Sequence, residues 1–171
     1  MIVQSLSLSV KGFFYIYKLS IMENLNVKIQ GTSETGARFV AGARQFSIVI
    51  DEPPSLGGDD LGANPVEYLL ASYAGCINVV AHLTARELGI NLRKLSTTVD
   101  GEINPARLFG TSDTERAGFK HINVGFFPET DSEPDRIAEW VEVIKNRCPV
   151  NDNLSQPTPL SFNVSQLEDV A

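Results

Sequence analysis

The chain has 171 residues and a mass of 18.7 kDa, the size of one domain or of a domain with a tail. Hydrophobic residues make up 43% and charged residues 20%, which is ordinary for a globular protein and excludes disordered, collagen-like and coiled-coil chains. Because 21 acidic residues outweigh 14 basic ones, giving a net charge of -7, we expect neither nucleic acid nor an anionic membrane as a partner.

The first 21 residues differ in composition from the rest. They contain Lys11 and Lys18 but no acidic residue, and they are rich in apolar side chains. They lack the basic start and the cleavage site of a signal peptide, and they are too short and too polar to span a bilayer. A second methionine, Met22, is a better place for the domain to begin. We therefore predict an amino-terminal extension over residues 1–21, acting as an extra strand or arm, and a single domain over residues 22–171.

Alternating apolar and polar residues predict a group of strands at the beginning of the domain. The alternation over Leu25–Gln30 is typical of a half-buried strand. Residues 37–40 and 45–50 predict a hairpin, joined by the small residues 41–43. Residues 51–63 contain two prolines and three glycines and are therefore predicted to be a loop.

A long helix is predicted over Pro65–Leu88. Asn64 can cap its first turn, Pro65 suits the first helical position, and Glu67 stands where a capping box needs its acidic partner. Gly89 suits the end of the helix. Because the middle of the helix is apolar and rich in small residues, we expect it to be buried on every side, with a helix of a second subunit close by.

The remaining elements alternate between strand and helix. Strands are predicted over residues 95–103 and 121–127, and a second helix is predicted to start at Ser132 and to stop at Pro149. The segment 160–164 is predicted to be a closing strand. This order of elements indicates an α+β fold with a mostly antiparallel sheet.

The chain has two cysteines, Cys76 in the long helix and Cys148 at the end of the second helix. Two cysteines and two histidines are too few for a secreted disulfide framework or a zinc site, so we expect a cytoplasmic protein. Both thiols can simply be small buried hydrophobic groups. Alternatively, Cys76 is a reactive thiolate and Cys148 its resolving thiol, in which case Arg38 or Arg44 must offset the effect of burial on Cys76.

Glu67 has two interpretations. It matches a capping box, which makes it a structural residue. It lies nine residues before Cys76, about 900° around a helix with 3.6 residues per turn, and therefore on the opposite face. It therefore cannot touch Cys76 from the same straight helix.

Two stretches around the cysteines resemble the OsmC/Ohr family of osmotically inducible protein C and organic hydroperoxide resistance proteins. The first is Leu56–Cys76, in which a glycine-rich loop precedes Asn64-Pro65, an acidic residue, a small-residue helix and the cysteine. The second is Arg147-Cys148-Pro149-Val150, which is similar to the family's second cysteine motif. The resemblance covers residues 23–165 and is closest to the OsmC-like branch.

The resemblance implies a fold, an oligomer and a chemistry. The fold has antiparallel sheets wrapped around central helices, and two chains intertwine into a homodimer. The activity is that of a thiol-dependent peroxidase for organic, fatty-acid-type hydroperoxides, with Cys76 attacking the peroxide and Cys148 resolving the sulfenic acid. No bound cofactor is implied, since an external dithiol, often lipoyl-linked, regenerates the thiols.

The sequence departs from the hydroperoxide resistance branch at its activating residues. That branch has its functional Glu directly after the proline, where this chain has Val66, and Glu67 comes one residue later. Its catalytic Arg lies in a Gly-Gly-Arg turn, which Gly36-Ala37-Arg38 matches loosely, and Arg44 competes for the role. Two other functions therefore stay open: a protein of this fold that binds a small hydrophobic ligand, and a redox sensor that does not turn over.

Overall fold

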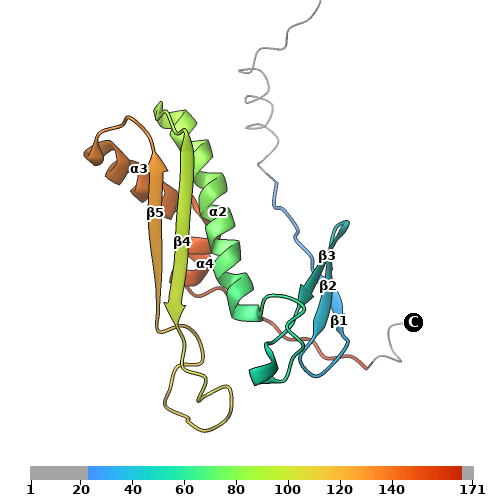
Figure 1. The fold of residues 1–171 in the computed structure, drawn as a ribbon. Coiled ribbons are helices and arrows are strands. Elements are labelled where there is room, and N and C mark those ends of the chain that lie inside the picture. Colours follow the sequence, from blue (N-terminus) through green and yellow to red (C-terminus); the bar gives the residue numbers. More distant parts are fainter. Residues whose placement is uncertain (1–22, 167–171) are drawn as a thin grey trace, which may run out of the picture. The chain divides into compact units, whose positions relative to one another are not determined.

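The computed structural model describes residues 23–166 (Figure 1). The chain divides after Gly62 into two compact units, each of which is described by itself. The predicted extension over residues 1–21 lies outside the described residues, and the single domain over residues 22–171 stays a prediction.

The first unit is built on a three-stranded antiparallel sheet. Its strands are β1 (Gln30–Ser33), β2 (Phe39–Ala43) and β3 (Phe46–Ile50), with β2 in the centre. A short 3-10 helix, η1 (Pro54–Leu56), interrupts the loop that follows. The predicted hairpin and loop are thus confirmed.

Two details of the first unit differ from the prediction. The strand predicted over residues 25–30 begins only at Gln30, because the sheet offers no strand to pair with the residues before it. The hairpin turns at Arg44 and Gln45, not at residues 41–43, which belong to β2. Arg44 takes the positive φ of 56° in this turn, and its guanidinium lies 5.1 Å from the centre of the Phe46 ring.

The second unit begins with α2 (Pro65–Leu88), which has the predicted bounds. The Glu67 amide donates to Asn64 Oδ1 at 2.9 Å, and the Asn64 amide donates to Glu67 Oε2 at 2.8 Å, so the capping box is complete. Gly89 ends the helix at a φ of 70°, a conformation that glycine adopts at little cost.

The other elements of this unit form a layer of helices against a two-stranded sheet. Strands β4 (Lys94–Glu102) and β5 (His121–Glu129) pair antiparallel, and α2 packs against β4, α3 (Pro134–Arg147) and α4 (Pro149–Ser155) (Figure 1). Trp140 is the largest fully buried side chain, and its indole N–H donates to Thr84 Oγ1 at 2.8 Å.

Two predictions for the second unit are wrong, and a third, that Pro149 stops the second helix, is confirmed but incomplete. Helix α3 starts at Pro134 with Glu133 as its cap, not at Ser132, because proline fits the first helical position. Pro149 ends α3 but also begins α4, for the same reason. The segment 160–164 is not a strand, since no described strand pairs with it, and its apolar side chains are exposed.

Helix α2 is only partly buried, contrary to the prediction of burial on every side. Its buried side chains lie along one face, whereas Ala71, Ser72, Gly75 and Val79 are exposed. The helix is long and apolar enough to cross a membrane, but its packing against β4, α3 and α4 is that of a core helix.

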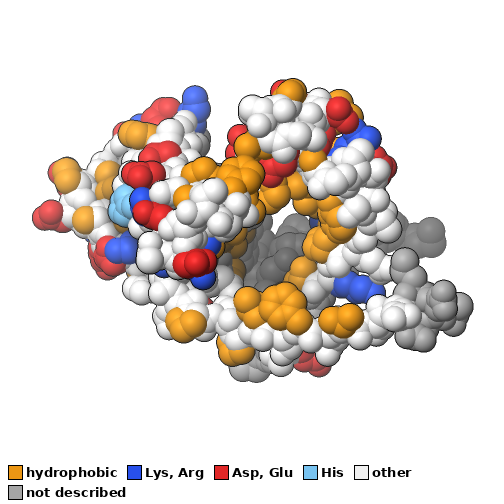
Figure 2. Space-filling view, turned by 90° about the horizontal axis from the view of Figure 1, so that it is seen from below, with side chains coloured by type: hydrophobic (Ala, Val, Ile, Leu, Met, Phe, Trp, Pro, Cys, Tyr) orange, Lys and Arg blue, Asp and Glu red, His pale blue; other side chains and the backbone are white. Residues whose placement is uncertain are grey.

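On the face shown in Figure 2, acidic and basic side chains are interspersed, and exposed hydrophobic side chains lie between them.

Candidate active site

The second unit brings the two cysteines together, although 72 residues separate them in the sequence. Cys76 lies in the middle of α2, and Cys148 lies between α3 and α4. Their Sγ atoms are 3.1 Å apart and both thiols are free. Cys148 is only 1% exposed, whereas Cys76 is half-buried. A disulfide bond is about 2.05 Å long, so the sulfurs need to approach by only about 1 Å to form one.

The surroundings of Cys76 favour its neutral form. Burial raises the pKa of the Cys76 thiol, and the neighbouring Cys148 thiol raises it further. The backbone N–H of Val150 acts against this by donating to the sulfur, but it does not restore the ordinary pKa. Because the thiolate is the nucleophile, an attacking Cys76 needs a cation beyond the groups that surround it in this unit.

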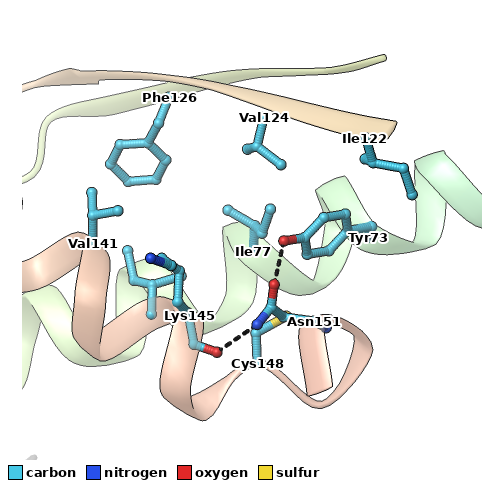
Figure 3. A pocket seen from close by; sticks show the side chains of 10 residues that line it. Tyr73, Ile77, Ile122, Val124, Phe126, Val141, Lys145, Cys148 and Asn151 are labelled. Atoms are coloured by element: carbon cyan, nitrogen blue, oxygen red, sulfur yellow. Dashed lines mark hydrogen bonds between the residues drawn. The ribbon is translucent and has the colours of Figure 1, made fainter. Parts of the chain in front are cut away.

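A hydrogen-bond network fixes the segment after Cys148. The backbone N–H of Asn151 donates to Cys148 Sγ at 3.4 Å. The side-chain Nδ2 of Asn151 donates to the Lys145 carbonyl at 3.0 Å. The Tyr73 hydroxyl, one helical turn before Cys76, donates to Asn151 Oδ1 at 2.5 Å (Figure 3). Burial, followed by the two nearby thiols, raises the pKa of Tyr73, so the hydroxyl stays protonated as a donor.

Sequence reasoning missed Tyr73 and Asn151. They lie 78 residues apart, so no local pattern connects them. The sequence could have pointed to both residues only through their spacing from the cysteines. Tyr73 comes three residues before Cys76, and Asn151 comes three residues after Cys148. Side chains three residues apart on a helix share a face, which places Tyr73 beside the first thiol.

An apolar cavity of about 280 Å³ adjoins Cys148. Figure 3 shows Ile122, Val124 and Phe126 pointing from β5 toward the helices, and Tyr73 and Ile77 pointing from α2. Among the described residues that line the cavity, Lys145 alone has a charged side chain. Its Nζ forms an ion pair with Glu142 at 2.7 Å. The cavity is close in size to the smallest typical small-molecule pockets of roughly 300 Å³.

The predicted activating residues are divided between the two units. Glu67 is in the second unit, where its carboxylate completes the capping box with Asn64. Arg38 and Arg44 belong to the first unit, so a role of either beside Cys76 stays a prediction.

Arg38 is held by acidic residues of its own unit. Its Nε pairs with Glu34 at 2.9 Å and its Nη1 pairs with Asp59 at 3.0 Å. The loop that carries Asp59 is fixed by Asp51, which is 1% exposed and accepts backbone N–H groups from Glu52, Asp59 and Leu61. Burial acts to raise the pKa of Asp51, but these donors and Arg38 outweigh it and keep the pKa low.

Among residues 23–166, no three His, Cys, Asp or Glu side chains are grouped so that they could hold a metal ion. The two touching thiols offer attack by a sulfur and closure of a disulfide.

The chain is similar to several known proteins. The chain is 27% identical to a hydroperoxide reductase of Mycoplasma genitalium over 120 residues, covering 70% of this chain and 80% of the relative. An OsmC-like protein from Mycoplasma pneumoniae has a similar fold, with a TM-score of 0.68 and 23% identity over 79% of this chain and 91% of the other. An organic hydroperoxide resistance protein from Legionella pneumophila has a TM-score of 0.56 at 19% identity, covering 77% and 90% of the two chains.

The family assignment rests on a match to a family model. The model of the OsmC-like proteins matches residues 57–163, which include both cysteines and the elements between them. This match spans more than half of the chain. The chain therefore belongs to the OsmC-like protein family.

Proposed function

We propose that this protein is a thiol-dependent peroxidase that reduces organic, fatty-acid-type hydroperoxides. The observation that carries the proposal is the 3.1 Å contact between the Cys76 and Cys148 sulfurs, both of which are free. Support comes from distant homologues named hydroperoxide reductase and from the OsmC-like family match. A sulfenic acid formed on one of two touching thiols is condensed to a disulfide before a second peroxide reaches it.

The proposed catalytic cycle has three steps: attack on the peroxide, closure of the disulfide and its reduction. The Cys76 thiolate attacks the terminal peroxide oxygen, so an S–O bond forms, the O–O bond breaks, and the alkoxide leaves to be protonated to the alcohol. The Cys148 sulfur then attacks the sulfenic sulfur, forming the disulfide and releasing water. An external dithiol, lipoyl-linked in our proposal, reduces the disulfide and becomes a disulfide itself.

Cys76 is the better attacking thiol of the two. It is half-buried, whereas Cys148 is almost fully enclosed and therefore suited to resolving the sulfenic acid from inside. We propose that Arg38 supplies the missing cation, because Glu34 and Asp59 hold its guanidinium in one orientation, and that Arg44 is the alternative. Glu67 either orients that arginine or serves as the helix cap alone.

We propose that the working form is a homodimer in the cytoplasm. The small-residue face of α2, with Ala71, Ser72, Gly75 and Val79, is exposed and can accept a second helix closely. The alternating segments 25–29 and 160–164 expose apolar side chains that a partner strand would cover. A reducing compartment suits a protein whose thiols must be regenerated.

Peroxide consumption tests the proposal. With tert-butyl hydroperoxide or a fatty-acid hydroperoxide and a dithiol reductant, we expect turnover by the wild type and none by Cys76→Ser. In Cys148→Ser we expect sulfenic acid to accumulate on Cys76 after one equivalent of peroxide. Arg38→Gln and Arg44→Gln, compared side by side, identify the arginine that lowers the pKa of Cys76. Equal consumption by the wild type and Cys76→Ser would disprove the proposal.

The apolar cavity beside Cys148 favours a second candidate function, the binding of a small hydrophobic ligand. In that case the thiols are structural, and native mass spectrometry would detect a ligand that copurifies with the protein. A redox sensor, the third alternative, would form the disulfide once without cycling. Rapid and repeated formation of the Cys76–Cys148 disulfide would exclude both alternatives.

A further inference from the structure

Arg38 is held more firmly than most arginines near a protein surface. Its Nε donates to Glu34 Oε2 at 2.9 Å, and its Nη1 donates to Asp59 Oδ2 at 3.0 Å. The Arg38 side chain is only 19% exposed, whereas those of Glu34 and Asp59 are 50% and 64% exposed. Because a guanidinium is planar, two carboxylates at two of its nitrogens restrict its rotation as well as its position.

The two carboxylates attach Arg38 to different parts of the first unit. Glu34 lies four residues before Arg38, and the turn between them is closed by the Glu34 N–H, which donates to the Arg38 carbonyl at 2.9 Å. Glu34 therefore fixes the guanidinium only relative to its own turn. Asp59 is 21 residues further along the chain and ties the guanidinium to the loop after β3.

The loop around Asp59 is fixed by bonds to its backbone. The carboxylate of Asp51, which is 1% exposed, accepts the Asp59 N–H at 3.2 Å, and the Glu52 carbonyl accepts the Asp60 N–H at 3.2 Å. A Cβ at Gly58 would lie 1.8 Å from that carbonyl oxygen, so this close approach of the chain needs glycine. The position of Asp59 is thus set without its side chain, and its carboxylate is left to bind Arg38.

One edge of the Arg38 guanidinium stays unused. Its Nε and Nη1 are bonded to carboxylates, whereas Nη2 makes no hydrogen bond to any of residues 23–166. Since the group is planar, fixing Nε and Nη1 also fixes the direction in which the N–H groups of Nη2 point. Ion pairs between exposed side chains contribute little to stability, so the effect we expect from Asp59 is on this direction.

We propose that Asp59 is a positioning residue that directs the free Nη2 edge of Arg38, and that the buried Asp51 holds Asp59 in place. This inference rests on the proposed peroxidase function, in which an arginine acts on Cys76 and its peroxide. It assigns that role to Arg38, because the exposed Arg44 makes no ion pair within residues 23–166 and is not held in this way.

Glu67 is then a helix cap alone. Its carboxylate already accepts the Asn64 N–H at 2.8 Å, and the carboxylates that hold Arg38 both come from the first unit. A glutamine at position 67 can still complete a capping box. Glu67→Gln therefore removes the charge and keeps the cap.

Asp59 has two opposite effects on the proposed chemistry. Its carboxylate orients Arg38, but its negative charge offsets part of the positive potential of the guanidinium. In Asp59→Asn we therefore expect Cys76 to ionise at least as readily as in the wild type, while each thiolate reduces peroxide more slowly. In Arg38→Gln we expect both ionisation and peroxide reduction to be weakened. A residue that only stabilised the loop would not separate the two quantities.

Nitrogen-15 NMR of the full chain tests the positioning without any peroxide. In the wild type we expect separate Nη signals for Arg38, assigned by their loss in Arg38→Gln, because rotation about the Cζ–Nε bond is restricted. In Asp59→Asn we expect these signals to merge, and in Asp59→Glu, which restores a carboxylate, to separate again. Asp60→Asn removes the same charge from the next residue and is the matched control. It and Glu67→Gln should match the wild type.

Kinetics then tests the consequence for the reaction. The rate of Cys76 alkylation against pH gives the ionisation of the thiol, and peroxide reduction at the alkaline plateau of that profile gives the rate per thiolate. We expect Asp59→Asn to lower the rate per thiolate roughly tenfold or more, since small displacements of reacting groups are costly, and Asp60→Asn to leave it unchanged.

Three results would overturn the inference: merged Nη signals of Arg38 in the wild type, equal plateau rates in Asp59→Asn and Asp60→Asn, or a loss in Glu67→Gln as large as that in Asp59→Asn. Equal peroxide consumption by the wild type and Cys76→Ser would instead disprove the peroxidase function. The NMR signals of Arg38 do not depend on that activity, so the failure of one proposal is distinguishable from the failure of the other.

Discussion

Asn151 links three segments of the thiol site by single hydrogen bonds. It joins Tyr73 of α2 to the Lys145 carbonyl of α3, and its own N–H reaches Cys148. Each of these bonds restricts the position of the Cys148 sulfur relative to Cys76. A positioning residue of this kind controls the resolving step, not the attack on peroxide.

We therefore expect Asn151→Ala to slow disulfide formation by about tenfold or more, since a 1 Å displacement of reacting groups can cost about a hundredfold. Rapid mixing with one equivalent of peroxide, with dimedone trapping of the sulfenic acid, measures the two steps apart. Tyr73→Phe is expected to act in the same direction. The control is Asn153→Ala on the same helix, and unchanged resolving rates in all three variants would rule out the role.

The environment of Cys76 predicts a pH dependence. In the variant that lacks the activating arginine, burial and the Cys148 thiol hold the pKa of Cys76 above the ordinary value, so the thiolate fraction, and with it peroxide consumption, rises with pH through the neutral and mildly alkaline range. Initial rates at saturating reductant from about pH 7 to 9, around the ordinary cysteine pKa of about 8.5, measure this. A flat profile would mean that Cys76 is already ionised at pH 7.

Residue-level prediction succeeded where the signal was local and failed where it was not. Cys76, Cys148 and the Asn64–Glu67 capping box stand in short motifs, so their positions could be read from the sequence. The contact between Tyr73 and Asn151 depends on how α4 packs on α2, which no motif encodes.

At the scale of elements, α2 and α3 are joined through a buried polar contact. The indole N–H of Trp140 on α3 donates to the hydroxyl of Thr84 on α2, and both side chains are fully buried. Thr84 in turn donates to the Val80 carbonyl at 2.8 Å. The contact fixes the two helices that carry the thiols at one relative position.

Thr84→Val is expected to lower the free energy of unfolding by roughly 1–3 kcal/mol, because it leaves the buried indole N–H without its acceptor at nearly unchanged volume. Urea denaturation followed by circular dichroism measures this. Thr84→Ser keeps the hydroxyl and is the matched control. If the valine variant proved as stable as the serine variant, the hydrogen bond would not contribute to holding the helices together.

Helix bounds were more predictable than strand bounds. Helix α2 carries its own start and stop signals, and its predicted range was confirmed without change. A strand requires a partner edge, so the alternating pattern at residues 160–164 could not by itself produce one. Pro149 was interpreted as a stop because proline disrupts helix interiors, although it is equally suited to the first turn of α4.

At the scale of the whole molecule, the exposed apolar segments have the most direct consequence for assembly. Leu160, Phe162 and Val164 are 78%, 90% and 95% exposed, and Leu25 and Val27 are similarly open. Apolar residues at every second position lie on one face of a strand. Exposing such an apolar face to water is unfavourable. We propose that strands of a second copy cover them in the homodimer.

Light scattering after gel filtration is expected to give twice the 18.7 kDa chain mass for the wild type. Phe162→Ser removes the largest apolar side chain of this segment and should shift the equilibrium toward the monomer at low protein concentration. Asn163→Ser, on the alternate face, should leave it unchanged. A wild-type protein that is monomeric at all concentrations would exclude the proposed assembly.

The contact between the two sulfurs exists before any oxidation takes place. Its conversion into a bond requires no helix to unwind, so backbone amides of α2 and α3 are expected to exchange their hydrogens equally slowly in both redox states. The surface of the second unit around the thiols is then expected to be the same in both redox states. A partner protein would find no difference in shape there, which supports the proposed catalyst over a redox sensor that a partner must recognise.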